Sequence, residues 1–113
     1  MAAYCPDTGD IIWLDFQQSV ATEQAGRRPR ACAVATGGFN QLTGRCIASP
    51  ITQRDRDWSF HVALPQDEEI SGVVQADQLR SASWEQRGSR FICKASARVL
   101  EEVRARLKPL LSL

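Results

Sequence analysis

The sequence is poor in the side chains that usually bind metal ions. Its single histidine is His61, and its four cysteines include no C-x-x-C pair. This pattern excludes the common zinc sites and most hydrolytic centres that depend on clustered histidines. We therefore expect no metal and no cofactor. We expect reduced thiols, packed in the core of a cytosolic protein, at Cys5, Cys32, Cys46 and Cys93.

The chain also lacks long apolar runs. No stretch approaches the roughly 20 residues that a membrane-spanning helix needs, and the first residues, "MAAYCPDTGD", lack the basic and apolar regions of a signal peptide. We expect no membrane association. With 113 residues, 43% of them hydrophobic and 24% charged, the composition predicts one globular domain over residues 1–113.

Net charge is low as well, at +1, so a polyanionic partner must be met by a local basic patch. Only two of the 14 basic residues are lysines, a bias that suits bidentate phosphate contacts but that a GC-rich genome would also produce. The stretch "TEQAGRRPR" (residues 22–30) holds one carboxylate and three guanidinium groups. It is either a solvated linker or part of a phosphate site.

Alternating and apolar segments predict a mainly β protein. Strands are expected at Gly9–Phe16, Arg30–Thr36, Arg45–Thr52 and Trp58–Leu64, with more strand material in "GVVQADQLRSASW" and "SRFICKA". In the fourth segment, alternation places Trp58, Phe60, Val62 and Leu64 on one face, and His61 on the polar face as a surface residue.

Glycines and an asparagine in "GGFNQLTG" indicate a turn, and Pro50 indicates a strand edge or bulge. Only the C-terminal segment is predicted to be helical. Ser96 is its expected N-cap, and an apolar stripe recurs at helical spacing. The stripe consists of Leu100, Val103, Leu107 and Leu110. Glu102 and Arg106 form an i,i+4 pair, and Pro109 should loosen the last turn. Short strands followed by one helix favour a small antiparallel barrel closed by that helix.

One phosphodiester reaction needs neither metal nor an enzyme-borne nucleophile. In RNA the 2′-hydroxyl can attack the adjacent phosphate, provided that a proton acceptor, a proton donor and fixed positive charge surround it. A carboxylate with several guanidinium groups, as in residues 22–30, is sufficient in kind.

Five blocks occur in this order along the chain: "YCPDTGDIIWLDF", "EQAGRRP", "FNQLTG", "SPIT" and "ADQLRSASW". Together they resemble the MazF branch of the MazF/PemK family of toxin endoribonucleases, from about Tyr4 to Leu111. The resemblance implies an SH3-like barrel with a C-terminal helix, as in the MazF/PemK/CcdB-like fold, working as a homodimer in the bacterial cytoplasm. It implies metal-independent cleavage of single-stranded RNA, usually mRNA, at short sequences. The products carry a 2′,3′-cyclic phosphate and a 5′-hydroxyl, and translation and growth are inhibited. A cognate, MazE-like antitoxin would lay an acidic segment over the active groove.

The resemblance also implies site residues. The arginine before proline is Arg28, the threonine of "SPIT" is Thr52, and the acid of "EQAG" is Glu23. A guanidinium stays protonated in proteins, so we expect Arg28 to stabilise the phosphorane rather than to act as the base. Proton delivery to the leaving oxygen is its second candidate role. Thr52 would donate a hydrogen bond to a non-bridging oxygen. Glu23 is the candidate acceptor of the 2′-hydroxyl proton, or else a loop acid paired with Arg27.

A second branch of the family uses an aspartate as base, with an arginine two residues before it. Here Asp77 is present, but position 75 is Gln75, which favours Arg28 and Thr52 instead. MazF proteins also tend to have a second threonine where this chain has Gln53, so its base preference should differ.

The remaining candidates for substrate contact are Asn40, Arg54, Arg56, Asp77, Gln78, Arg80 and Trp13, together with Gln53. Arg54 and Arg56 interleave with acids, so their loop is either solvated or grips phosphates. Trp13 and Trp58 could stack bases, although core or dimer-interface packing is favoured.

Two other functions remain open. A gyrase-poisoning toxin of the same fold would present an aromatic C-terminal tail, whereas this chain ends in "LKPLLSL". A non-catalytic RNA- or protein-binding barrel would bind its ligand and leave it uncut.

Overall fold

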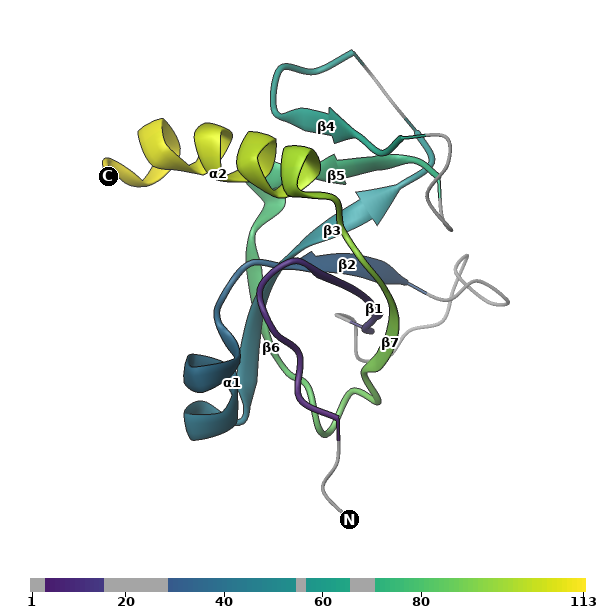
Figure 1. The fold of residues 1–113 in the computed structure, drawn as a ribbon, viewed down its shortest axis with the longest axis vertical. Helices are drawn as coiled ribbons and strands as arrows, with labels where there is room; N and C mark the ends of the chain where they lie inside the picture. Colours follow the sequence, from purple (N-terminus) through teal and green to yellow (C-terminus); the bar gives the residue numbers. More distant parts are fainter. Residues whose placement is uncertain (1–3, 16–28, 55–56, 66–70) are drawn as a thin grey trace.

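A computed structural model describes residues 4–15, 29–54, 57–65 and 71–113 of the chain (Figure 1). These residues form seven strands, two α-helices and one 3-10 turn. In chain order the elements are β1 (Asp10–Trp13), β2 (Arg30–Ala33), α1 (Gly37–Thr43), β3 (Arg45–Thr52), β4 (His61–Ala63), β5 (Val73–Gln75), η1 (Ala76–Gln78), β6 (Arg80–Ser83), β7 (Arg90–Lys94) and α2 (Ala97–Leu111). The predicted class, mainly β with a C-terminal helix, is confirmed.

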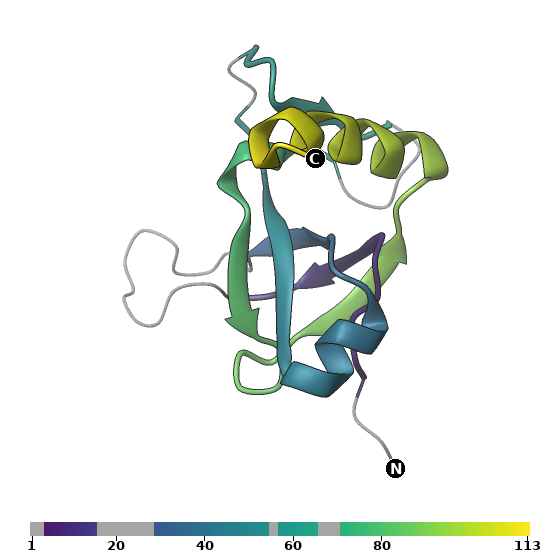
Figure 2. The same cartoon turned by 90° about the vertical axis from the view of Figure 1, so that its left-hand side faces the viewer.

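The sheet is antiparallel and built around β3. Its strand order is β4-β5-β3-β2-β1-β7, and β6 pairs with the first half of β3. Because none of the pairings within the described residues joins β4 to β7, the sheet curls without closing, and the expected barrel is only approximate. Figure 2 shows α2 lying across one end of this curled sheet and α1 near the other.

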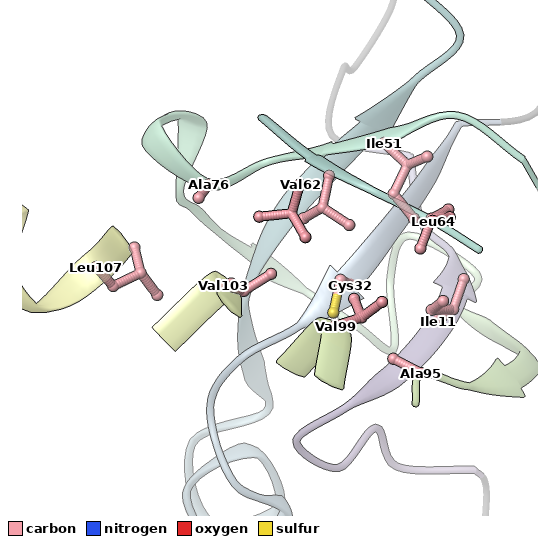
Figure 3. Close-up of a cluster of buried hydrophobic side chains, with 11 residues drawn as sticks. Ile11, Cys32, Ile51, Val62, Leu64, Ala76, Ala95, Val99, Val103 and Leu107 are labelled. Carbon is pink, nitrogen blue, oxygen red and sulfur yellow. The ribbon is translucent and has the colours of Figure 1, made fainter. Parts of the chain in front are cut away.

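Both faces of the sheet are covered by apolar side chains. On one face, Ile11 and Cys32 pack with Val99, Val103 and Leu107 of α2 (Figure 3). On the other, the curl of the sheet brings Ile12 of β1 against Trp84, which follows β6. Alternate residues of β1 therefore enter different cores, as the period of a strand requires.

Pro50 lies inside the sheet rather than at its edge. It is paired with Ala31 of β2. On the other side of β3, pairing with β6 ends at Ala48 and pairing with β5 begins at Ile51. The missing N–H of proline is tolerated here because β3 changes partners at this point.

The segment predicted to be a turn after β2 is the helix α1. Thr36 caps its start by accepting from the Phe39 N–H, and Gly44 ends it in the left-handed region with φ 73°. Both caps are ordinary helix signals. The sequence nevertheless predicted a turn, because two glycines and an asparagine, which are typical turn residues, lie between the two caps.

The C-terminal helix agrees with the prediction in its cap and differs in its buried stripe. Ser96 accepts from the Val99 N–H at 3.2 Å. The side chains that bury this helix are Val99, Val103 and Leu107, spaced by four residues, while Leu110 is 45% exposed. Leu100, also expected in the stripe, is only partly buried.

The polar face of this helix carries the expected ion pair. Glu102 contacts Arg106 at 3.8 Å and also Arg98 at 2.5 Å. Pro109 lies within the helix, which continues to Leu111. The proline therefore does not end the helix.

Two of the four thiols are core residues as expected. Cys32 and Cys46 are fully buried, whereas Cys5 and Cys93 are partly exposed, and all four are free. Burial raises the pKa of Cys32 and of Cys46 to about 12, which keeps both as unreactive thiols at neutral pH.

Candidate functional site

Thr52 is the last residue of β3, where its Cα is paired with Val73 at the start of β5. Its side chain is partly exposed. The Thr52 Oγ1 accepts a hydrogen bond from the Arg54 backbone N–H at 3.1 Å. Because the hydroxyl uses a lone pair in this contact, its proton can still be donated to a substrate oxygen. The bond also holds the hydroxyl oxygen in place.

The start of β2 lies beside the end of β3. Arg30, the first residue of β2, is paired with Ile51 of β3 and with Trp13 of β1. In Figure 1 this end of the sheet is on the right, where β2 begins and β3 ends. The residue that precedes Arg30, Pro29, accepts the Leu14 backbone N–H at 3.0 Å. From Pro29 the chain therefore enters β2 beside the end of β3, where Thr52 lies.

A polar network lies directly beside Thr52. The amide Nε2 of Gln53 donates to the Ser71 carbonyl oxygen at 3.3 Å and to Ser71 Oγ at 3.2 Å. The Nη1 of Arg30 donates to the same carbonyl at 3.2 Å. These bonds fix Ser71 and the Gly72 that follows, which has φ 117° and packs on the Thr52 backbone. Sequence reasoning missed both residues, although a glycine before a short apolar run was a signal for a special backbone angle.

A second polar group lies on η1 and the start of β6. Asp77 Oδ2 accepts the indole N–H of Trp58 at 2.8 Å, while Gln78 and Arg80 are exposed. Arg80 is paired with Ala48. Thr52 lies four positions after Ala48 on β3, about 13 Å along the strand. The predicted substrate contacts thus form two groups. One lies at the end of β3, and the other lies on η1 and at the start of β6, beside the middle of β3.

Trp58 does not lie on the apolar face that alternation predicted. It precedes a turn ahead of β4 and is 49% exposed, whereas Val62 and Leu64 are buried as expected. The strand begins only at His61, so the alternation rule does not apply to Trp58. Trp13, the other tryptophan considered for stacking, is partly buried at the end of β1.

Asn40 is a structural residue, contrary to the prediction that it contacts substrate. It is 0% exposed. Its amide Nδ2 donates to the carbonyls of Pro6, at 2.8 Å, and Ala35, at 3.2 Å. In this position it joins the N-terminal segment to α1 and has no surface to offer an RNA strand.

Three predicted site residues, Arg28, Glu23 and Arg56, lie outside the described residues. Arg54 is described and exposed. Within the described ranges, no three side chains of His, Cys, Asp or Glu gather in a way that could hold a metal ion. The same ranges contain no helix with the length and apolar character needed to cross a membrane.

Comparison with known proteins gives consistent results over nearly the whole chain. Residues 7–111 match the family model described as "PemK-like, MazF-like toxin of type II toxin-antitoxin system". The chain is 34% identical over 111 residues to the endoribonuclease toxin MazF of Escherichia coli K12, with 98% of each protein covered. It is 33% identical over 106 residues to the endoribonuclease toxin ChpB of the same organism, with 90% of each covered.

Solved structures agree with these matches. The crystal structure of MazF from Deinococcus radiodurans superposes with a TM-score of 0.87 at 39% identity, covering 98% of this chain and 100% of that one. A MazE–MazF structure from the same organism gives a TM-score of 0.85 at 36% identity, covering 98% and 99%. The chain described here belongs to the PemK-like, MazF-like family of toxins of type II toxin–antitoxin systems.

Proposed function

We propose that this MazF-type toxin endoribonuclease cuts single-stranded RNA, chiefly mRNA, at short sequences and without a metal ion. In the reaction, the ribose O2′ forms a bond to the adjacent phosphorus and the bond from phosphorus to O5′ breaks. The products are a 2′,3′-cyclic phosphate and a 5′-hydroxyl end, and loss of mRNA stops translation and growth.

The observation that carries the proposal is the position of the Thr52 hydroxyl oxygen. It is partly exposed at the end of β3 and its lone pair is occupied by the Arg54 N–H. A hydroxyl that accepts this bond keeps its own proton free for donation to a non-bridging phosphate oxygen. A preorganised donor of this kind stabilises the charge that develops on the phosphorane.

Arg28 supplies the fixed positive charge in this proposal. In sequence it immediately precedes Pro29, whose carbonyl accepts the N–H of Leu14, the residue after β1. Pro29 leads into β2, and the first residue of β2 is paired with Ile51, next to Thr52. Because a guanidinium is protonated at the start of the reaction, Arg28 stabilises the phosphorane by its charge. It is also proposed as the donor of the proton to O5′. Glu23 accepts the proton from O2′. Before the next turnover, solvent returns a proton to Arg28 and removes one from Glu23.

Asp77 is less suited to the role of base. The indole N–H of Trp58 already occupies one of its oxygens, and Gln75 stands where the other family branch has an arginine. We assign Asp77 to substrate binding together with Gln78 on η1 and Arg80 at the start of β6. Residues Gln53, Arg54, Arg56 and Trp13 are proposed to contact the RNA near the end of β3.

The protein is proposed to act as a homodimer in the bacterial cytoplasm and to be inhibited by a cognate antitoxin. The existence of MazE–MazF structures among similar proteins supports an antitoxin partner. An acidic segment of that antitoxin would occupy the groove and compete with RNA for the same cationic side chains.

The direct test is to incubate the purified protein with one long RNA in excess EDTA and map the cut positions by primer extension. We expect discrete cuts whose upstream fragments carry a cyclic phosphate. Cleavage that requires magnesium would contradict the mechanism. Salt-dependent binding of the RNA without any cut would indicate a binding protein. A separate supercoiling assay tests the gyrase-poisoning alternative, which trapping of cleaved DNA by gyrase would indicate.

A further inference from the structure

Trp58 is exposed yet held in one orientation. Its side chain is 49% exposed. Its indole N–H donates to Asp77 Oδ2 at 2.8 Å, which fixes the edge of the ring against η1. Phe60 lies on one side, with ring centroids 5.5 Å apart and planes inclined at 47°. An indole tethered through its only polar atom leaves apolar ring surface available to a ligand.

The backbone around Trp58 is held as firmly as its ring. The Trp58 carbonyl accepts the His61 N–H at 2.9 Å, which closes the turn before β4. The next carbonyl, that of Ser59, accepts the Nε of Arg106 from α2 at 2.9 Å. Stacking of a ligand on this ring therefore costs little conformational entropy, because the ring and its backbone are already fixed before binding.

The surroundings of Trp58 match the chemistry of single-stranded nucleic acid. Gln78 and Arg80, both exposed, follow directly after the Asp77 that holds the indole. An amide can bond to a base edge, and a guanidinium can bond to phosphate. Arg54 is exposed in the segment that leads from Thr52 to Trp58. That segment spans at most about 20 Å, so Trp58 is within a few nucleotides of the scissile phosphate.

We propose that Trp58 is a stacking subsite for one unpaired base of the RNA strand, a few nucleotides from the cut. This inference rests on the proposed RNA cleavage and adds a binding residue to it. Trp58 does not touch the reacting atoms. Its contribution is to affinity and to register, because a base stacked on a fixed ring sets which phosphate reaches Thr52.

The test uses an RNA oligonucleotide centred on a mapped cut site, with 2′-deoxyribose at the cut position so that it binds without being cleaved. Its Kd is measured for the wild type, Trp58→Leu and Trp58→Phe. Loss of stacking predicts a Kd about 5- to 150-fold higher for Trp58→Leu. Trp58→Phe keeps a ring and loses the N–H, so its Kd should lie between those of the wild type and Trp58→Leu. With cleavable RNA, most of the loss should appear in KM rather than in kcat.

Phe91→Leu is the matched control. Phe91 is 50% exposed and lies on β7, at the opposite end of the strand order from β4. It should leave the Kd within about twofold of the wild type. A Trp58→Leu protein that binds as tightly as the wild type overturns the inference, and so does a loss of binding that is explained by dissociation of the dimer in sedimentation. A wild type that cuts no RNA overturns the proposed function as well, so the two failures are distinguishable.

Discussion

Gly72 and the carbonyl of Thr52 are in such close contact that no side chain fits between them. A Cβ placed on Gly72 would lie 2.5 Å from the Thr52 carbonyl oxygen, and the φ of Gly72 is 117°. The position of Thr52 thus depends on a residue 20 positions further along the chain. This contact is a consequence of pairing between β3 and β5.

We expect Gly72→Ala to lower both stability and cleavage. The positive φ alone costs about 1–2 kcal/mol, and the clash adds to this because a backbone atom must move. Each kcal/mol corresponds to a fall in Tm of about 4 °C for a domain of this size. Thermal unfolding and kcat of the folded protein measure the two effects.

Gly88→Ala is the control for that substitution, since Gly88 has φ 63° and no atom within 4 Å of the added Cβ. Gly88→Ala should lose only the stability that the positive φ costs a residue other than glycine, and it should retain the kcat of the wild type. Equal losses of Tm and kcat in both variants would refute the importance of the contact between Gly72 and Thr52.

Two substitutions of Thr52 distinguish the catalytic contribution of its hydroxyl from that of its side-chain shape. Thr52→Val removes the donor and should reduce kcat by about 100- to 1,000-fold, the usual effect of losing one preorganised donor. Stability should change by about 1 kcal/mol or less, because the lost bond to the Arg54 N–H is on the surface. Thr52→Ser should retain most of the activity. Normal cleavage rates in Thr52→Val would remove Thr52 from the mechanism.

Asn40→Ala should be a stability mutant. It leaves the buried carbonyl of Pro6 and the partly buried carbonyl of Ala35 without the Asn40 donor, at about 1–3 kcal/mol for a buried group left unsatisfied. Below its Tm the folded variant should bind RNA with the wild-type KM. The exposed neighbour Gln41, changed to Ala, should alter neither quantity. A higher KM with an unchanged Tm would restore Asn40 as a substrate contact.

Asp7 should make stability depend on pH in the acid range. Backbone N–H groups of Gly37, at 2.7 Å, and Thr8, at 2.9 Å, donate to its carboxylate and lower its pKa. Because the pKa is lower in the folded state, the ionised carboxylate stabilises the folded protein fully above the unfolded-state pKa of about 4. This stabilisation is lost as the pH falls through the pKa of the folded state. The difference in urea midpoint between wild type and Asp7→Asn should therefore be constant near pH 7 and shrink below about pH 4. A difference that is independent of pH would contradict this.

The strands and the helix α2 could be predicted from the sequence because their patterns are local. The bounds of β3 agree with the prediction, and the Ser96 cap was recognised from its own position. The helix α1 was missed because glycines at residues 37 and 38 are typical of turns. Trp58 was misplaced because alternation was extended across a turn that the sequence does not mark.

The site could be predicted only in part, because its geometry depends on contacts between distant residues. Thr52 could be nominated from a block of four residues. Its contact with Gly72 depends on the pairing of β3 with β5, and the burial of Asn40 depends on the path of the N-terminal segment. Neither relationship has a periodic signal in the sequence.

Attack by the ribose of the substrate is the central claim, and one substitution in the RNA tests it. A single 2′-deoxyribose is placed at a mapped cut position in an otherwise unchanged RNA, and both strands are incubated with the wild-type protein. We predict that the modified strand is bound but remains intact at that position, while the all-ribose strand is cut there. Cleavage of the modified strand at the same phosphate would contradict the account.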